Sequence, residues 1–397
     1  MRVLCLDIEG GFGGSSRSLY ESLRFIGPDF CPEVWCRKAG PAQQRYSQLD
    51  IPSVVHTDMP HISSLPLLSR NLFIYYKFAA NWRRTSNFRS ELAARSDTDF
   101  DLIHFNHEGL FLLAQWLRRA LGSRITMTAH VRTHLPENAF TRWQYRGLAN
   151  AVDGTVFITE MERNRVRRLV GKDVVGKVIY NIVSNDDDVI PCLELQADTR
   201  FKIASTSNFA YVRGTDRLVD VALELKKMSA DTRFLIVVAG HSKLTGRMPG
   251  QLGEIATRGG TLADYAEARG VGHMFKFLGH VPDTRPYVSG CQALLRPSRG
   301  NDPWGREVLE AMALGVPVVS TGKYNRFVED GVTGVLRSTF DAGDFAAALI
   351  RLADDQSLQE SLGQTARFRV QGLCNGPDRA AELSRFWSSV VERKTKQ

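Results

Sequence analysis

Two carboxylates that stand eight residues apart, Asp302 and Glu310, have the most informative spacing in the sequence. Asp302 lies in a polar loop after an apolar segment that ends at Pro297, and Glu310 lies in a predicted helix that begins near Trp304. The helix is expected to end before Pro317, where another strand begins. Open α/β sheets bind ligands at the carboxyl ends of their strands, so both carboxylates are expected to face a ligand. The alternative is a solvated loop residue and a helix-surface residue.

Two loops could supply groups that bind an anion. Near the N-terminus, strand Val3–Asp7 leads into a glycine-rich turn at residues 9–16 and a helix from Arg17 to Phe25. Such a turn lets backbone N–H groups and a helix N-terminus point at an anion. Its spacing is not that of the G-x-G-x-x-G dinucleotide motif, and a tight turn without a ligand is the alternative. In the second half, a loop at 208–214 leads into a helix from Thr215 to Met228.

Two histidines follow neighbouring predicted strands. His107 comes after Leu102–Phe105, and His130 comes after Arg124–Thr128. A histidine at the carboxyl end of a strand is placed to meet a ligand, although a single such histidine is as often structural. Because the two ends lie side by side, the pair predicts a polar site at this edge of the sheet.

Strands and helices alternate along both halves of the chain. This alternation predicts an α/β fold with two doubly wound, Rossmann-like domains that face a central cleft. We expect an N-terminal domain over residues 1–183, a polar linker over 184–199 and a C-terminal domain over 200–376. The last predicted helix, at 377–397, is expected to pack back on the N-terminal domain.

Two further local predictions concern the C-terminal domain. Residues 242–260 form a longer loop that is expected to be mobile. Residues from Arg326 to Asp330 are expected to form a short helix before the strand Val335–Arg337.

The composition is that of a globular protein, and 397 residues make two domains the natural expectation. The longest apolar runs are of strand size, far short of the roughly 20 residues that a membrane span needs. The N-terminus enters a strand at once without the apolar core of a signal peptide, so the chain is expected to be cytoplasmic. The six cysteines have no metal-ligand spacing, and we expect reduced thiols and no metal site.

The positive charge is concentrated in the first half. Residues 1–180 contain 24 Lys and Arg against 17 Asp and Glu, which accounts for 7 of the net charge of +8. Residues 70–95 are predicted to be helical and mix basic with aromatic side chains, a composition suited to an anionic bilayer surface. The alternative is a helix with its aromatic face in the core and its basic face solvated. Nucleic-acid binding is not expected, because no reader motif is present.

Four segments of the second half together resemble the donor-site signature of retaining family-4 glycosyltransferases, which have the GT-B fold. The segments are Pro297-Ser298, Asp302-Pro-Trp-Gly305, Glu310-Ala-Met-Ala-Leu-Gly-Val-Pro317 and Glu329-Asp-Gly-Val-Thr-Gly334. The resemblance is strong over residues 270–337, moderate over 200–240 and loose in the first half. It implies an acceptor-side N-terminal domain and a C-terminal domain that binds a nucleotide diphosphate sugar, whose sugar is transferred with its anomeric configuration kept.

The resemblance also implies roles for single residues. Glu310 would hold the ribose hydroxyls, since an ionised carboxylate offers only acceptors. Asp302 would meet hydroxyls of the donor sugar, and His130 would reach the sugar or the reacting centre from the other domain. The diphosphate would be bound by Arg213 in the loop that begins at Asn208, and by backbone N–H groups near Gly13, Gly14 and the run Trp304, Gly305, Arg306 and Glu307. No metal ion and no cofactor besides the nucleotide sugar are implied.

The sequence departs from the family pattern at two places. The family's usual first Glu is Asp302 here, which is shorter by one methylene, and Glu307 is a rival for its role. The family's usual Arg–Lys pair at the diphosphate is Asn208 and Arg213, so that one of two cations is lost. We expect Arg306 or Arg296 to compensate.

The resulting hypothesis is a metal-independent glycosyltransferase of polysaccharide biosynthesis whose acceptor is a lipid-linked or membrane-associated glycan. It would be cytoplasmic and peripheral at the inner face of a membrane. The alternatives are a GT-B-fold nucleotide-sugar epimerase, a non-catalytic subunit that binds nucleotide sugars, and a nicotinamide oxidoreductase suggested by the glycine-rich turn alone.

Overall fold

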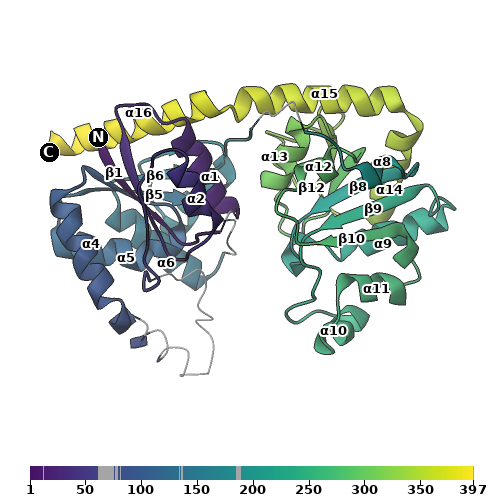
Figure 1. Ribbon diagram of the computed structural model, residues 1–397. Coiled ribbons are helices and arrows are strands. Elements are labelled where there is room, and N and C mark those ends of the chain that lie inside the picture. The colour runs from purple at the N-terminus through teal and green to yellow at the C-terminus, as the bar shows by residue number, and fades with distance from the viewer. Residues whose placement is uncertain are drawn as a thin grey trace. The chain divides into compact units, whose positions relative to one another are not determined.

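The chain forms two compact units, each built on a parallel β-sheet (Figure 1). The first unit comprises Met1–Ile182 and Gly376–Gln397, and the second comprises Val183–Asn375. The computed structural model describes residues 1–11, 13–60, 76, 79, 80, 82–133, 135, 137–184 and 189–396. Two doubly wound α/β units confirm the predicted fold class.

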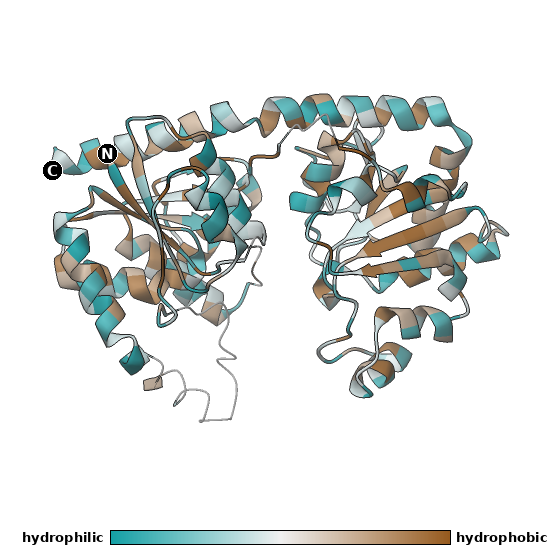
Figure 2. Ribbon diagram, in the orientation of Figure 1, coloured by the Kyte–Doolittle hydropathy of each residue, from teal (hydrophilic) through white to brown (hydrophobic). Residues whose placement is uncertain are grey.

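The first unit contains a seven-stranded sheet in the order β3-β2-β1-β4-β5-β6-β7, whose described pairs are all parallel. Its inner strands are mostly apolar (Figure 2). Strands β4, β5 and β6 are buried throughout and β1 is buried from Val3 onward, as expected for a parallel sheet covered on both faces, whereas the edge strands β3 and β7 are partly exposed. The strands are β1 (Arg2–Asp7), β2 (Cys31–Cys36), β3 (Ser53–Val55), β4 (Leu102–Phe105), β5 (Thr126–Val131), β6 (Gly154–Phe157) and β7 (Gly176–Val178).

Helices cover both faces of this sheet and form two apolar clusters. One cluster packs α4, α5, α6 and α7 against the sheet, and the other packs α1, α2 and the C-terminal α16. At Gly154 a Cβ would lie 2.8 Å from the ring of Phe386 and 2.9 Å from Val390, so the glycine admits α16. The helices are α1 (Gly14–Arg24), α2 (Pro41–Ser47), α4 (Ser86–Thr98), η1 (Glu108–Leu110), α5 (Phe111–Leu121), α6 (Ala139–Ala151), α7 (Glu160–Val170) and α16 (Gly376–Thr395).

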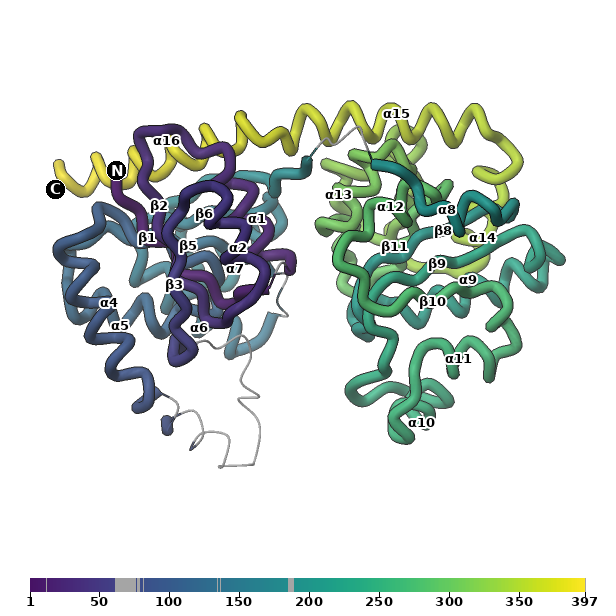
Figure 3. Tube along the Cα trace, in the orientation of Figure 1, coloured from purple at the N-terminus to yellow at the C-terminus, as the bar shows by residue number. Residues whose placement is uncertain are grey.

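The second unit contains a six-stranded parallel sheet in the order β10-β9-β8-β11-β12-β13 (Figure 3). The strands are β8 (Phe201–Thr206), β9 (Phe234–Ala239), β10 (Phe275–Gly279), β11 (Ala293–Arg296), β12 (Val318–Thr321) and β13 (Gly334–Arg337). The helices are α8 (Leu193–Gln196), η2 (Tyr211–Arg213), α9 (Arg217–Lys227), α10 (Gly250–Thr257), α11 (Leu262–Ala268), η3 (Gly272–Met274), α12 (Arg285–Val288), α13 (Arg306–Ala313), α14 (Ala342–Asp354) and α15 (Gln356–Leu373).

Three local predictions were wrong. No helix forms from Arg326 to Asp330, where the chain bends at 326–327 and Asp330 then forms a bridge with Gly334 across a turn at 331–333. Residues 242–260 are not an unstructured loop, because they contain α10 and a bridge from Lys243 to Thr261. The strand predicted to end at Thr128 continues to Val131, because Ala129, His130 and Val131 pair with β6.

The basic and aromatic segment at 70–95 lies largely outside the described residues. Residues 76, 79, 80 and 82–84 are helical, and α4 begins at Ser86. No helix among the described residues is long and apolar enough to cross a bilayer.

Candidate functional site

A small pocket lies at the carboxyl ends of β8 and β11 in the second unit. The strand order of the sheet reverses between these two strands, which is where open α/β sheets bind ligands. Three charged side chains line the pocket, namely Arg213, Arg296 and Glu307. The remaining lining residues are Ser205, Thr206, Ser207, Thr215, Leu294, Leu295 and Pro297. The pocket is small, at about 10 Å³, which is room for about one water molecule, and two cations and a carboxylate meet in its lining.

Arg296 is the most buried of these charged groups and holds both candidate carboxylates. Its Nη2 donates to Asp302 Oδ2 at 2.7 Å, its Nε donates to the backbone oxygen of Asp302 at 2.8 Å, and its Nη1 forms an ion pair with Glu307. Burial lowers the pKa of Arg296; nearby Asp302 opposes that shift and the positive charge of Arg213 adds to it. The two cations thus act on each other in one small region.

Asp302 is held on both sides. Besides Arg296, it accepts a hydrogen bond from the hydroxyl of Ser298, which is only 1% exposed. Asn301 in the same loop has a positive φ of 52°, a conformation that Asn tolerates better than most residues. Asp302 does not line the pocket, whereas Glu307 does. The structure therefore separates the two rival carboxylates.

Glu310 lies on α13 one turn beyond Glu307 and is 7% exposed. Arg306 donates from Nε to Glu310 Oε1 at 3.2 Å along the same helix. Gly305 is the N-cap of α13 without a side-chain hydrogen bond, and Trp304 before it is buried. The predicted backbone run from Trp304 to Glu307 thus leads into the N-terminus of α13, whose helix dipole favours an anion.

Arg213 is exposed, and its side chain makes no hydrogen bond or ion pair with the described residues. Arg213 is the last residue of η2. Its loop is held by the buried Asp216, whose two carboxylate oxygens accept hydrogen bonds from Arg299 at 2.6 and 2.5 Å. Arg217 donates to the backbone oxygens of Pro297 and Ser298, at 3.1 and 3.2 Å. These contacts join the Arg213 loop to the loop that carries Asp302.

Gly214 lies close to the loop that carries Asp302. It has a φ of +72°, and a Cβ there would lie 2.0 Å from the backbone oxygen of Pro297. We expect Gly214→Ala to lower the stability of the second unit by at least about 2 kcal/mol, because the left-handed conformation alone costs about 1–2 kcal/mol. The affinity for a ligand bound at Arg213 should also be lower in this variant.

The matched control is Gly259→Ala, since Gly259 has a φ of +78° but no described atom within 4 Å of a Cβ. Urea denaturation of both variants measures the difference. Equal losses of stability in the two variants would contradict the close approach to Pro297.

Asn208 is exposed and accepts a hydrogen bond through Oδ1 from the backbone N–H of His241 at 2.9 Å. Gly240 beside it has a φ of +134°, and a Cβ there would lie 2.6 Å from the backbone of Ser207. In this chain Asn208 thus links the loops that follow β8 and β9, a structural task for the residue that replaces the family's expected cation.

In the first unit, Gly13 and Gly14 begin α1 and are exposed. Gly13 is the N-cap, no described side chain caps the helix, and its first turn contains no acidic residue. A Cβ at either glycine would meet no described atom within 4 Å. Among the described residues the helix N-terminus is thus open, as an anion site requires.

His130 lies inside β5 and is 4% exposed, and neither of its ring nitrogens has a hydrogen-bond partner among the described residues. Its ring packs edge-on against His104 at 5.7 Å between centroids. Burial lowers the pKa of His130 well below its usual value, with Arg132, His104 and His107 adding to the shift. The ring is therefore neutral near pH 7, so that one of its nitrogens can donate a hydrogen bond and the other can accept one.

The sequence predicted a polar site at this edge of the first sheet, but it did not predict the hydrogen-bond network that the structure shows there. Asn106 donates to Asp7 Oδ1 at 3.1 Å and accepts from Arg132 Nη2 at 2.6 Å and Nε at 2.9 Å. The backbone N–H of Arg132 donates to the buried Glu108 at 2.9 Å. Burial raises the pKa of Asp7, while Asn106 and Arg132 oppose the shift. The network fixes the chain just after His130.

The predicted residues thus gather within each unit. Arg213, Asp302 and Glu307 surround Arg296 in the second unit, and Glu310 lies one turn from Glu307. Within the part of the chain that the structure describes, no group of three or more His, Cys, Asp or Glu is placed to hold a metal ion.

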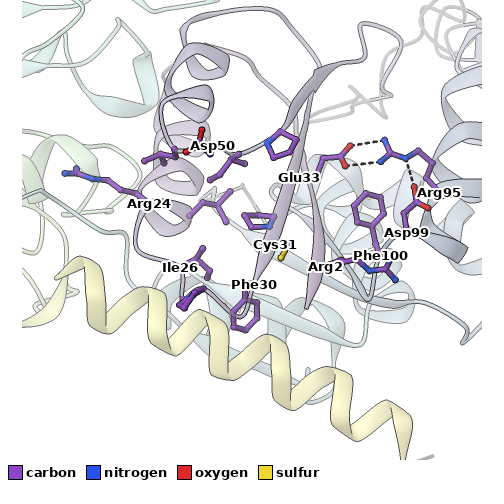
Figure 4. A pocket seen from close by; sticks show the side chains of 17 residues that line it. Arg2, Arg24, Ile26, Phe30, Cys31, Glu33, Asp50, Arg95, Asp99 and Phe100 are labelled. Carbon is purple, nitrogen blue, oxygen red and sulfur yellow. Dashed lines mark hydrogen bonds and ion pairs between the residues drawn. The ribbon is translucent and has the colours of Figure 1, made fainter.

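Figure 4 shows a different hollow of about 590 Å³ in the first unit. Arg2 and Cys31, the first residues of β1 and β2, line it, so it lies at the edge of the sheet opposite to His130. One of its cations, Arg95, already forms hydrogen bonds of 2.9 Å with Glu33 and Asp99 (Figure 4). This hollow is therefore separate from the candidate residues.

Both halves of the chain match known glycosyltransferase families. Residues 194–369 match the family described as Glycosyl transferases group 1, and residues 13–187 match Glycosyltransferase Family 4. The chain belongs to the family-4 glycosyltransferases. The predicted family is confirmed.

Two curated relatives show what this family-4 glycosyltransferase is similar to. The lipopolysaccharide core biosynthesis glycosyltransferase LpsE of Rhizobium meliloti is 31% identical over 186 residues, or 43% of this chain and 53% of LpsE. A phosphatidyl-myo-inositol mannosyltransferase of Mycobacterium leprae is 24% identical over 279 residues, or 66% of this chain and 67% of the relative. The chain thus spans about half the length of LpsE and about two thirds of the mannosyltransferase.

Solved structures confirm the GT-B fold. HepE of Anabaena, crystallised with UDP and glucose, superimposes with a TM-score of 0.78 at 19% identity, covering 98% of this chain and 100% of HepE. Sucrose-phosphate synthase of Thermosynechococcus elongatus gives a TM-score of 0.71 at 19% identity, covering 99% and 100% of the two chains.

Proposed function

We propose that this glycosyltransferase moves a sugar from a nucleotide diphosphate sugar to a lipid-linked or membrane-associated glycan, with retention of configuration and without a metal ion or cofactor. The pocket at the reversal point of the second sheet carries this proposal, because Arg213 and Arg296 there face Glu307, with Glu310 one turn away. Retention rests on the resemblance to retaining members of the family.

The charge of Arg213 is available to a diphosphate, since its side chain is exposed and has no partner among the described residues. A guanidinium can hold two phosphate oxygens at once, and the same contacts strengthen as negative charge collects on the departing diphosphate. The backbone N–H groups at the start of α13, from Trp304 to Glu307, add a second source of positive potential. Together they supply the charge stabilisation that a metal ion would otherwise supply.

Glu310 is proposed to accept hydrogen bonds from the two ribose hydroxyls. Its position on a regular helix, with Arg306 against one oxygen, holds the carboxylate in a fixed orientation. Asp302 and Glu307 are the two candidates for the hydroxyls of the donor sugar.

In the first unit, we assign the open N-terminus of α1 at Gly13 and Gly14 to the diphosphate, and His130 to the donor sugar or the reacting centre. The two ring nitrogens of His130, unpartnered among the described residues, support its assignment, because a buried polar atom without a partner is costly unless a ligand satisfies it. A neutral ring can donate a hydrogen bond to a sugar hydroxyl through one nitrogen or accept one from it through the other.

The acceptor class is supported by the curated relatives, whose names place LpsE in lipopolysaccharide core biosynthesis and the second relative on phosphatidyl-myo-inositol. The basic excess of residues 1–180 is consistent with a protein that works, in the cytoplasm, at an anionic membrane surface. The basic and aromatic segment at 70–95 is the proposed contact.

The experiment that tests the proposal is incubation with a panel of UDP-, GDP- and ADP-sugars and a membrane extract, with and without EDTA. We expect one donor to be consumed, the product to keep the anomeric configuration by NMR, and EDTA to have no effect. Epimerisation of the nucleotide sugar without an acceptor would favour the epimerase, and binding without turnover would favour a non-catalytic subunit. If no donor binds, the proposal is wrong.

Flotation with vesicles tests the membrane contact separately. We expect the protein to float with vesicles that contain anionic lipid and to remain behind with neutral vesicles, and the difference should vanish at high salt. Indifference to anionic lipid would remove the membrane surface from the proposal and leave the transferase activity in place.

A further inference from the structure

Arg296 joins the two carboxylates that compete for the donor sugar. All three of its side-chain nitrogens are used: Nη2 and Nε by the side chain and backbone of Asp302, and Nη1 by Glu307. The guanidinium is only 8% exposed, so these contacts are largely shielded from water. One buried cation thus fixes both the loop before α13 and the first turn of α13.

The two carboxylates differ in how much of each is already engaged. Asp302 uses Oδ2 for Arg296 and Oδ1 for the hydroxyl of Ser298, and it does not line the pocket. Glu307 lines the pocket and uses Oε1 for Arg296. Its Oε2 makes no hydrogen bond with the described residues, and it can accept one from a ligand.

We propose that Arg296 is the positioning residue of the donor pocket: it anchors Asp302 inside the loop and presents Glu307 to the hydroxyls of the donor sugar. This inference rests on the proposed function and assigns the sugar contact within it to Glu307. It also gives a reason for the shortened carboxylate at 302. The aspartate side chain, with one methylene, accepts hydrogen bonds from both Arg296 and Ser298. The longer side chain of a glutamate at this position would have to break one of these two hydrogen bonds.

The charges around Arg296 make the arrangement sensitive to its removal. Arg213 lies near it on η2, Asp302 in the loop and Glu307 on α13. Arg306 directly precedes Glu307 on α13, and Glu310 follows it by one turn. Without Arg296, Asp302 and Glu307 lose their shared cation, and two neighbouring carboxylates hold a proton between them more readily. Binding that needs Glu307 ionised would then weaken as the pH falls.

The test uses calorimetric titration with UDP, GDP and ADP and with their glucose or mannose forms, continued with the pair that binds most tightly. We expect Glu307→Gln to weaken binding of the nucleotide sugar by about 10-fold and to change binding of the bare nucleotide by less than about 2-fold. Asp302→Asn should weaken both by a similar factor. Asp302→Glu, although it restores the family's residue, should bind the nucleotide sugar at least about 3-fold more weakly than wild type.

Arg296 itself is tested by pH dependence. Between about pH 8 and 6 we expect Arg296→Met to lose up to about 10-fold more affinity for the nucleotide sugar than wild type, and Arg296→Lys to restore most of it. The control is Lys202→Met, which removes another buried cation of the same unit, whose Nζ donates to the backbone oxygen of Asp198 at 2.7 Å. The control should not change the pH dependence.

The outcomes separate this inference from the proposed function. If wild type binds a nucleotide sugar but Asp302→Asn alone removes the preference for it over the bare nucleotide, the assignment to Glu307 is wrong. A pH dependence of Arg296→Met equal to that of wild type would remove Arg296 from the positioning role. If Arg296→Met does not fold, the binding of the nucleotide sugar and of the bare nucleotide to Glu307→Gln and Asp302→Asn decides whether Glu307 contacts the sugar. If wild type binds none of the compounds, the proposed function and this inference fall together.

Discussion

Replacement of Glu310 by alanine is expected to weaken nucleoside diphosphate binding by about 100-fold. The carboxylate is 7% exposed and is fixed on α13, so it meets a ribose without having to be ordered first. Each hydrogen bond to a charged group contributes about 1.5–3 kcal/mol, and two of them amount to about 3 kcal/mol or more. Calorimetric titration with the nucleoside diphosphate measures this loss, because the ribose contact does not depend on the sugar.

Two controls separate lost binding from lost folding. Glu310→Gln keeps the shape and one acceptor, so its loss should be about 10-fold. Glu360→Ala removes an exposed glutamate of α15, which is hydrogen-bonded to Gln356, and should leave the affinity unchanged. If Glu310→Ala binds the nucleotide as tightly as Glu360→Ala, the ribose role is wrong.

The position of Glu310 could be predicted from the sequence because the signals are local. Apolar residues recur along α13 at Val308, Leu309 and Met312, and Gly315 and Pro317 stop the helix. The helix period and the stop signals lie within a dozen residues of each other, which is why the helix was predicted correctly, although α13 begins at Arg306, two residues later than predicted.

The clustering around Arg296 could be predicted only in part. The sequence suggested Arg296 as a substitute for a lost cation at the diphosphate, and the structure instead shows it engaged with Asp302 and Glu307. That geometry depends on how the loop between β11 and α13 folds back, including a positive φ at Asn301. The conformation of such a loop cannot be predicted from the periodic pattern of apolar residues, because loops have no such pattern.

The network in the first unit was missed because it has no local spacing at all. Asp7 and Asn106 are 99 residues apart, and they meet only because β1 and β4 are neighbours in the sheet. The extension of β5 through His130 was missed for a related reason: pairing with β6 lengthens the strand beyond its apolar run. Strand order is a tertiary property, which single-sequence patterns do not specify.

Acidification from about pH 7 to about pH 5 is expected to destabilise the first unit through its two buried histidines. Burial lowers the pKa of His104 to about 3, with Arg132 adding to the shift, and lowers that of His130 well below its usual value. The folded rings therefore stay neutral while the unfolded chain takes up protons below about pH 6.5. Stability must fall with pH throughout the window between the two pKa values, by about 2 kcal/mol for His104 between pH 7 and 5.

The variant that tests this is His104→Asn, which keeps a polar atom near Thr128, the partner of His104 Nδ1 at 3.0 Å, and does not titrate. We expect its loss of stability between about pH 7 and 5 to be smaller than that of wild type by about 2 kcal/mol. Urea denaturation followed by tryptophan fluorescence reports the first unit selectively, because that unit contains five of the six tryptophans, namely Trp35, Trp82, Trp116, Trp143 and Trp387.

The comparison between variants is needed because other groups titrate in the same window. Asp7 acts with the opposite sign: burial raises its pKa, so the folded state takes up its proton at a higher pH than the unfolded chain does. This contribution is common to wild type and His104→Asn and cancels in the difference. His280→Asn, at an exposed histidine of the second unit, should leave the pH dependence of the first unit unchanged. If His104→Asn loses as much stability on acidification as wild type, His104 is not held neutral in the folded protein, and the uncharged state assigned to its neighbour His130 loses its physical basis.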